Sequence, residues 1–262
     1  MVVNKCDLDL IALANGLLTC ADLGYLLLGK AIHCHILRRG VRFDLVGTTA
    51  LIDMYSKCKH LSAATNVFYR TDAKDDALFN VMIAGYLHNG CVFRAIETFC
   101  EMVAMCVRPN TGTIISVLSA LSDMGDIRAG KCVHGYVFRQ GLEANIDIAN
   151  QLITMYAKCG FIKCARRVFD RIKMKDKVSW TSMMTVLVNH GLANEATTLF
   201  GLMQRENQHP DAVTFTCLLQ AVNQLGSTTN VFIIKDYRVV ECCSGITSRA
   251  AKTVFPELNM QD

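Results

Sequence analysis

The sequence repeats itself at a shift of 101 residues, and this repetition constrains the fold more than any other feature. The segment LIDMYSKC at 51–58 returns as LITMYAKC at 152–159. The same shift relates a longer set of identical pairs without a gap: Gly29 and Gly130, His33 and His134, Val67 and Val168, Phe68 and Phe169, Gly90 and Gly191, and Pro109 and Pro210. Internal periodicity of this kind indicates an array of stacked structural units.

Each block divides into three units in which two apolar helices are separated by a turn. From Ala149, apolar residues recur at helical spacing up to Tyr156, and Gly160 ends the run. The prolines at 109 and 210 lie in the joins between units, where a missing N–H costs little. No stretch alternates between apolar and polar residues as a strand does. The pattern therefore predicts an all-α solenoid of antiparallel helix-pair repeats.

Composition excludes several other classes of protein. With 52% hydrophobic and 19% charged residues, the 262-residue chain has too much to bury to be disordered. Thirteen cysteines are an odd number for a secreted disulfide scaffold. No two of them have CxxC spacing, and clusters such as His33-Cys34-His35 do not form a zinc knuckle. We therefore expect no metal or cofactor, with cysteine and methionine packing between helices.

The apolar segment 8–28 raises the question of a membrane span. It contains Asp9, Asn15 and Asp22, and each charge at bilayer depth costs about 2.5–3.5 kcal/mol. No other stretch reaches the length of a spanning helix. We expect a buried helix here and a soluble protein. The net charge of +4 is too small to indicate a nucleic-acid partner by itself.

Three kinds of recurring sequence motif connect the units to a known family. LGKAIHCHILRRG and AGKCVHGYVFRQG mark long units, whereas TALIDMYSKCKHLSAATNVF and NQLITMYAKCGFIKCARRVF mark short ones. LFNVMIAGYLHNG and VSWTSMMTVLVNHG begin ordinary ones. The chain thus resembles the pentatricopeptide repeat proteins of the plant long–short (PLS) subfamily, which implies a right-handed superhelix. The units expected are 10–44, 45–75, 76–110, 111–145, 146–176, 177–211 and a partial 212–226, after a lead-in (1–9) and before a divergent tail (227–262).

The resemblance also implies how RNA is recognised. Repeats of this type recognise one RNA base each through two or three side chains. We define a base-recognition pair as one residue on the first helix of a unit together with the last residue of that unit. Carried onto this sequence, the pairs are Thr49 with Asp75, Asn80 with Asn110, Asn150 with Asp176, and Thr181 with Asp211. The base-flanking residues are Val46, Ala77, Asp147 and Val178.

By the family's pairing rule, these pairs imply the RNA sequence 5′-n-G-Y-n-U-G-n-3′. The long units offer Ala14 with Asp44 and Ile115 with Asn145, which make no sensible pair. An alternative is that the Asp and Asn residues at the joins are ordinary helix N-caps. Basic residues are candidates for phosphate contacts, with a solvated outer face as the alternative: Lys30, Arg38, Arg39, Arg42, Lys131, Arg139, Lys163, Arg166 and Arg167.

The function expected by resemblance is sequence-specific binding of single-stranded RNA, an organellar transcript. It would guide C-to-U editing or transcript processing in a mitochondrion or chloroplast. The sequence holds neither HxE nor CxxC, so we expect no catalysis. A deaminase-bearing relative and editing accessory proteins would then act in trans, because the family's C-terminal extensions (E and DYW) are not recognised here. Two alternatives stay open: a tetratricopeptide-like scaffold for protein partners, and a truncated, non-functional relative whose 212–262 end is least stable.

Overall fold

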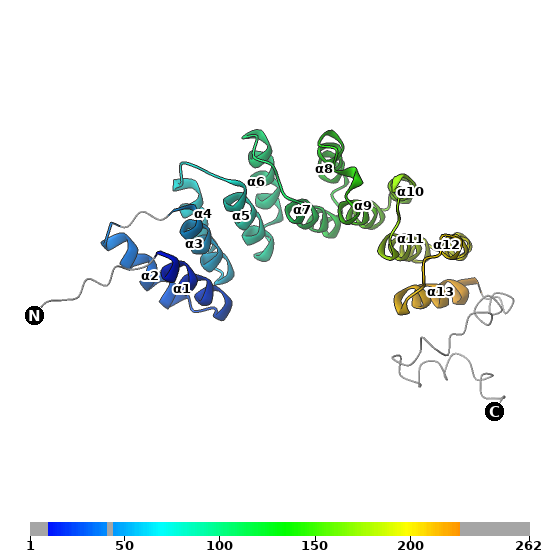
Figure 1. The fold of residues 1–262 in the computed structure, drawn as a ribbon, viewed down its shortest axis with the longest axis horizontal. Coiled ribbons are helices and arrows are strands. Elements are labelled where there is room, and N and C mark those ends of the chain that lie inside the picture. Colours follow the sequence, from blue (N-terminus) through cyan, green and yellow to red (C-terminus); the bar gives the residue numbers. More distant parts are fainter. Residues whose placement is uncertain (1–9, 41–43, 226–262) are drawn as a thin grey trace, which may run out of the picture. The chain divides into compact units, whose positions relative to one another are not determined.

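The computed structural model describes residues 10–40 and 44–225, which are drawn in colour in Figure 1. This part of the chain contains thirteen α-helices, one short 3-10 helix and no strand, so the prediction of an all-α fold is confirmed. The helices are α1 (Leu10–Leu23), α2 (Leu26–Arg38), α3 (Leu45–Lys57), α4 (Leu61–Arg70), α5 (Asp76–His88), α6 (Val92–Ala104), α7 (Thr111–Met124), α8 (Ile127–Arg139), η1 (Leu142–Ala144), α9 (Ile146–Lys158), α10 (Ile162–Arg171), α11 (Lys177–Asn189), α12 (Ala193–Arg205) and α13 (Ala212–Leu225). The expected lead-in and tail lie outside the described residues.

The chain divides into two compact units, which separate between Val133 and His134. In the first unit, α1 packs against α2 and α3, and α5 packs against α3 and α6. In the second unit, α9 packs against α10 and α11, and α11 packs against α12 and α13. Within each unit, successive odd-numbered helices contact one another: α1 with α3, α3 with α5, α5 with α7, α9 with α11, and α11 with α13.

The turn inside each helix pair uses the left-handed backbone conformation. Gly90, Gly160 and Gly191 have φ of +73°, +80° and +74° at this position. Glycine enters this region without the steric cost that a Cβ imposes. Lys59 occupies the same turn with φ of +60°, and its Nζ donates a hydrogen bond to His88 O at 3.1 Å. Lys59 therefore keeps the turn geometry that glycine adopts in the sister units.

The burial of sulfur differs between the two residue types. Met54, Met82, Met102, Met155 and Met203 are completely buried, as expected for flexible side chains that fill gaps. For cysteine, however, the expectation was wrong. Among the described cysteines only Cys20 and Cys217 are buried, and four are exposed: Cys34, Cys100, Cys106 and Cys132. Three of these four lie on α2, α6 and α8, which are second helices with an outward face.

The same difference between first and second helices appears in the apolar residues. Eight residues of α3 are buried, but only two residues of α4. A first helix is enclosed by neighbouring first helices and by its own partner, so apolar residues surround most of it. The second helix α4 is therefore less enclosed than the first helix α3.

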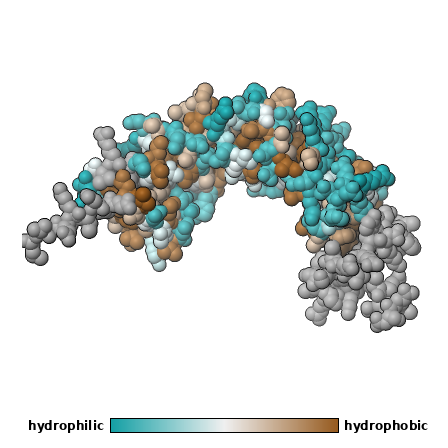
Figure 2. Space-filling model, in the orientation of Figure 1, coloured by the Kyte–Doolittle hydropathy of each residue, from teal (hydrophilic) through white to brown (hydrophobic). Residues whose placement is uncertain are grey.

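Residues 10–28, the described part of the apolar segment 8–28, depart from the expectation of one buried helix. Gly24 separates them into α1 and the start of α2, and Leu27 and Leu28 are 83% and 54% exposed. In Figure 2, apolar surface is more prominent over the N-terminal helices α1 to α3 than over the region around α12. Within the described ranges, none of the helices combines the length and apolar character that a bilayer crossing requires.

Several contacts recur at the 101-residue shift and explain why those positions repeat. His33 Nδ1 lies 2.9 Å from Tyr55 OH, and His134 Nδ1 lies 2.7 Å from Tyr156 OH. Each pair joins a second helix to the next first helix. Edge-to-face aromatic pairs repeat likewise, with ring centroids 5.3 Å apart for Phe68–Phe79 and 5.2 Å apart for Phe169–Trp180. Because these side chains meet across successive helix pairs, the repeat encodes the stacking of one pair on the next.

Candidate functional site

The last residues of the predicted base-recognition pairs stand directly before first helices, and each is an N-cap. Asp75 Oδ1 accepts from Leu78 N at 2.9 Å, and Asn110 Oδ1 from Thr113 N at 2.9 Å. Asp176 Oδ1 accepts from Ser179 N at 2.7 Å, and Asp211 Oδ1 from Thr214 N at 2.9 Å. The capping role considered for these residues is therefore present, and it holds the side chain in one orientation because a backbone N–H at N3 points at it.

The capping hydrogen bonds also keep two of these carboxyls charged. Burial by itself raises the pKa of Asp176, but hydrogen bonds from Ser179 N–H, Ser179 Oγ and Asn150 Nδ2 outweigh it, so the pKa lies below its usual value. At Asp211, burial is again outweighed, by the N–H and hydroxyl of Thr214 and by the positive charge of Lys177, and its pKa is lowered too. Both groups are therefore carboxylates at neutral pH, with only hydrogen-bond acceptors to offer.

The first-helix members of the pairs lie one turn inside their helices. Thr49 donates to Leu45 O at 2.7 Å, and Thr181 donates to Lys177 O at 2.8 Å. At Thr49 this bond uses the hydroxyl proton and leaves the oxygen as an acceptor. The Thr181 hydroxyl also lies 3.1 Å from Thr214 Oγ1, so its proton is shared between Lys177 O and that oxygen. Asn150 is 7% exposed, its Nδ2 lies 3.3 Å from Asp176 Oδ1, and its buried Oδ1 has no hydrogen-bond partner within the described chain. An unpaired buried amide oxygen is costly to the fold.

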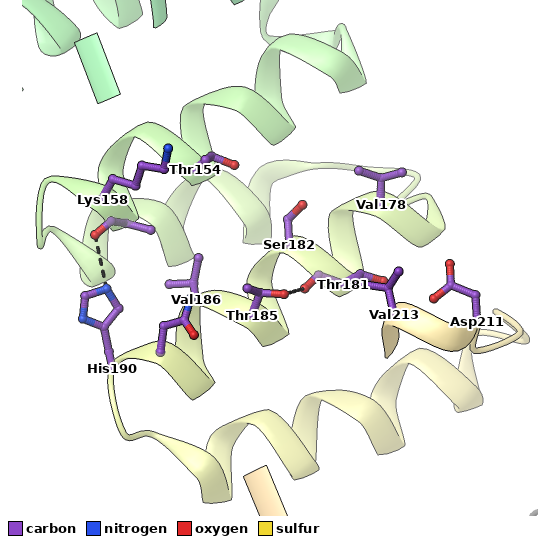
Figure 3. A pocket seen from close by; sticks show the side chains of 12 residues that line it. Thr154, Lys158, Val178, Thr181, Ser182, Thr185, Val186, His190, Asp211 and Val213 are labelled. Carbon is purple, nitrogen blue, oxygen red and sulfur yellow. Dashed lines mark hydrogen bonds between the residues drawn. The ribbon is translucent and has the colours of Figure 1, made fainter. Parts of the chain in front are cut away.

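In the second unit, one pair opens into a cavity of about 540 Å³, shown in Figure 3. Thr181 and Asp211 line it, with Val178 and Val213 beside them at one end and Lys158 and His190 at the other. Val178 and Val213 are 56% and 58% exposed. Exposed valines next to polar groups form a slot with apolar walls, and its size is within the range of small-ligand sites.

In the first unit, a cavity of about 340 Å³ contains the corresponding residues. Thr49 and Asp75 line it together with Val46 and Ala77. Val46 is 69% exposed, and Ala77 is also exposed. The structure thus brings together a hydroxyl, a carboxylate and exposed apolar side chains twice, once in each of the two compact units.

The pair Asn80 with Asn110 is joined through a third residue, Thr113 on α7. The Thr113 hydroxyl donates to Asn80 Oδ1 and also lies 3.0 Å from Asn110 Oδ1. Asp147, predicted to flank the base of the following short unit, is exposed. The long-unit residue Ala14 is buried, and Asp44 and Asn145 cap α3 and α9.

The candidate phosphate contacts have mixed surroundings. Arg166 Nε pairs with Asp170 Oδ1 at 3.1 Å, and Lys30 Nζ lies 3.3 Å from His60 Nε2. Arg42 is outside the described residues. In residues 10–40 and 44–225, no cluster of three or more His, Cys, Asp or Glu side chains is placed to hold a metal ion.

Comparison with known sequences identifies the repeats. The sequence profile of the PPR repeat matches residues 77–107 and 148–176, and that of the PPR repeat family matches residues 175–224. A pentatricopeptide repeat-containing protein of Arabidopsis thaliana is 38% identical over 198 residues, which is 76% of this chain and 28% of that protein. The chain is a pentatricopeptide repeat protein of plant type.

Other relatives of this pentatricopeptide repeat protein point the same way. The chloroplastic protein CRR2 of Arabidopsis thaliana is 35% identical over 204 residues, covering 77% of this chain and 31% of CRR2. The chain therefore spans less than a third of the length of these curated relatives. Among solved structures, the crystal structure of PPR10 from maize has a TM-score of 0.75 at 19% identity, over 90% of this chain and 35% of PPR10. PPR10 in complex with an 18-nt psaJ RNA element has a TM-score of 0.65 at 20% identity, over 85% and 33%.

Sequence reasoning missed the hydroxyls that support the pairs. Thr113, Ser179 and Thr214 each stand three residues after a capping residue and are buried. The available signal was a Thr or Ser at the N3 position of the first helix, which is a common place for a side chain to assist a cap. It also missed Lys158, which lines the same cavity as Thr181 and Asp211.

Proposed function

We propose that this protein binds single-stranded RNA by recognising bases one repeat at a time. The observation that carries the proposal is the repeated cavity in which a Thr hydroxyl, an Asp carboxylate and exposed apolar side chains meet, at Thr49–Asp75 and at Thr181–Asp211. A planar base has two apolar faces and a polar edge, and exposed valines with a polar floor complement both. The RNA complex of PPR10, a protein of similar fold, supports the same role.

The caps explain which edge each pair would recognise. Since Asp75, Asp176 and Asp211 use Oδ1 for the cap, Oδ2 is directed to a base and accepts a ring N–H, as guanine and uracil present. Asn110 uses its Oδ1 for the cap as well, so its Nδ2 is left to donate to a ring nitrogen. Together with Thr49, Asn80, Asn150 and Thr181, these groups correspond to 5′-n-G-Y-n-U-G-n-3′, with Val46, Ala77, Asp147 and Val178 beside the bases.

We place this RNA binding in the editing or processing of organellar transcripts, as a member of the long–short subfamily. The chloroplastic relatives support an organelle, mitochondrion or chloroplast. Because we assign no catalytic group to the chain, C-to-U chemistry would be supplied in trans by a deaminase-bearing relative with editing accessory proteins.

The test measures the affinity of the protein for two RNA oligonucleotides by fluorescence anisotropy. One carries GYnUG in the proposed order, and the other has the four specified bases scrambled. We expect the first RNA to bind more tightly, by about 1–3 kcal/mol for each base that is mismatched in the scrambled RNA. Equal affinities contradict base recognition. A protein partner that stays bound after nuclease treatment would instead favour the function of a protein-binding scaffold.

Substitution of one carboxylate sharpens this test. Asp211→Asn keeps the Oδ1 that caps α13 but replaces the acceptor Oδ2 with a donor. We expect the preference at this base to move from guanine, which has N1–H, to adenine, whose N1 is an acceptor. The matched control is Asp126→Asn, another cap, whose Oδ1 accepts from Arg128 N and Ala129 N and which lines neither cavity. Asp126→Asn should leave every base preference unchanged.

A further inference from the structure

The hydroxyls of Thr113 and Thr214 occupy equivalent positions in two units, and each connects two residues that lie thirty positions apart. Thr214 Oγ1 donates to Asp211 Oδ1 at 2.8 Å and lies 3.1 Å from Thr181 Oγ1. Thr113 Oγ1 donates to Asn80 Oδ1 and lies 3.0 Å from Asn110 Oδ1, so its one proton is shared between two amide oxygens. Each threonine therefore stands between the two members of one base-recognition pair, although it belongs to the first helix of the next repeat.

Burial makes these contacts specific. Thr214 is completely buried and Thr113 is 6% exposed, so their hydroxyls have no access to bulk water as an alternative partner. A buried hydroxyl without a partner is costly, and this cost favours the rotamers that keep the bridge intact. The bridge thus restricts the two side chains that it joins, and a restricted side chain loses less entropy when it binds a ligand.

The other two pairs lack this bridge, for different reasons. At Thr49–Asp75 the equivalent residue is Leu78, which has no hydroxyl. Among the described residues, Asp75 receives only the Leu78 N–H and the Thr49 hydroxyl bonds only to Leu45 O. At Asn150–Asp176 the equivalent residue is Ser179, which bonds to Asp176 Oδ1 at 2.8 Å, while Asn150 Nδ2 contacts that oxygen directly at 3.3 Å. The chain therefore offers two Thr–Asp pairs that differ in the presence of a bridging hydroxyl.

We infer that Thr113 and Thr214 are positioning residues for base specificity: each orients the base-recognition pair of the preceding repeat through its hydroxyl. This inference rests on the proposed RNA recognition and extends it from two side chains to three. Consequently, guanine discrimination should be stronger at Thr181–Asp211 than at Thr49–Asp75.

The experiment measures the affinity of the full chain for RNAs that differ only at the base assigned to Thr181–Asp211. Thr214→Val removes the hydroxyl at nearly constant volume, and we expect the preference for guanine over the other bases to fall about 2- to 10-fold, the range of one net hydrogen bond. Preference at the uracil position should not change. Thr214→Ser retains a hydroxyl and should restore the preference for guanine.

Thr198→Val is the matched control, because Thr198 lies on the second helix α12, lines neither cavity, and its exposed hydroxyl donates to Asn194 O in its own helix at 2.9 Å. It should leave discrimination unchanged. Thermal unfolding of each variant identifies any loss of folding, which would weaken binding to all RNAs equally and would not be repaired selectively by Ser. If the wild type shows no base preference at this position, the proposed function itself is wrong. If the wild-type preference persists in a folded Thr214→Val protein, only the positioning role is wrong.

Discussion

Gly85 is the position where a single methyl group should most clearly disturb the stacking of first helices. It lies in α5, and a Cβ built there would be 2.4 Å from Ser56 Oγ and 2.8 Å from Ser56 Cβ on α3. Ser56 is 2% exposed. Its hydroxyl can rotate, but its Cβ is attached to the backbone of α3 and cannot. Accommodating alanine therefore requires α3 and α5 to separate.

Two opposing effects determine the size of the change in stability. Replacing glycine by alanine inside a helix stabilises it by about 0.5–1 kcal/mol, because the unfolded chain loses freedom. Overpacking of a buried contact costs about 1–3 kcal/mol. Since the close contact involves Cβ atoms, we expect the second effect to dominate, and Gly85→Ala to lower the free energy of unfolding by about 1–2 kcal/mol.

Gly201→Ala in α12 is the matched control, because a Cβ at Gly201 meets no atom within 4 Å. This variant should gain about 0.5–1 kcal/mol. Urea unfolding followed by far-UV circular dichroism measures both variants. The double variant Ser56→Gly/Gly85→Ala removes one of the clashing Cβ atoms and should recover most of the stability. Equal stability of the two alanine variants, or no recovery in the double variant, would refute the packing argument.

Two further predictions concern the turn and the caps. Lys59→Gly should raise the free energy of unfolding by about 1 kcal/mol, because Lys59 has a left-handed φ of +60°. Gly160→Lys at the equivalent turn should lower it. Urea unfolding measures both variants. The pKa of Asp176 is depressed in the folded protein, so the carboxylate stabilises the fold above the unfolded pKa of about 4, and this contribution is lost as pH falls through the lower folded pKa. Asp176→Asn, which retains the cap oxygen, should therefore show a smaller loss of urea midpoint below about pH 4 than the wild type; an unchanged acid dependence would contradict this assignment.

The helical architecture was predictable because its signals are local. Helical spacing of apolar residues, the turn glycines and the 101-residue shift all depend on residues close in sequence or on direct comparison of two segments. Lys59 breaks the glycine pattern, yet it lies 101 residues before Gly160, and the structure gives both residues a positive φ.

Other features depended on what surrounds each helix. Cys34 and Cys132 were expected in the interior, yet both are exposed, because they lie on second helices whose outer face has no neighbour. Composition cannot distinguish the two faces of an apolar helix when only one of them is covered.

The sequence by itself determined the repeat and the fold class, and it identified the polar residues that we propose as base contacts. Only the tertiary structure decided which atoms of those residues remain for a ligand. Oδ1 of Asp211 accepts the capping hydrogen bond from Thr214 N. The Thr214 hydroxyl lies between that carboxylate and Thr181, which stands 33 positions before Thr214 in the chain. Such contacts arise when consecutive repeats stack, and no local pattern specifies them, because they depend on the distance and rotation between two helices rather than on the residues of either one.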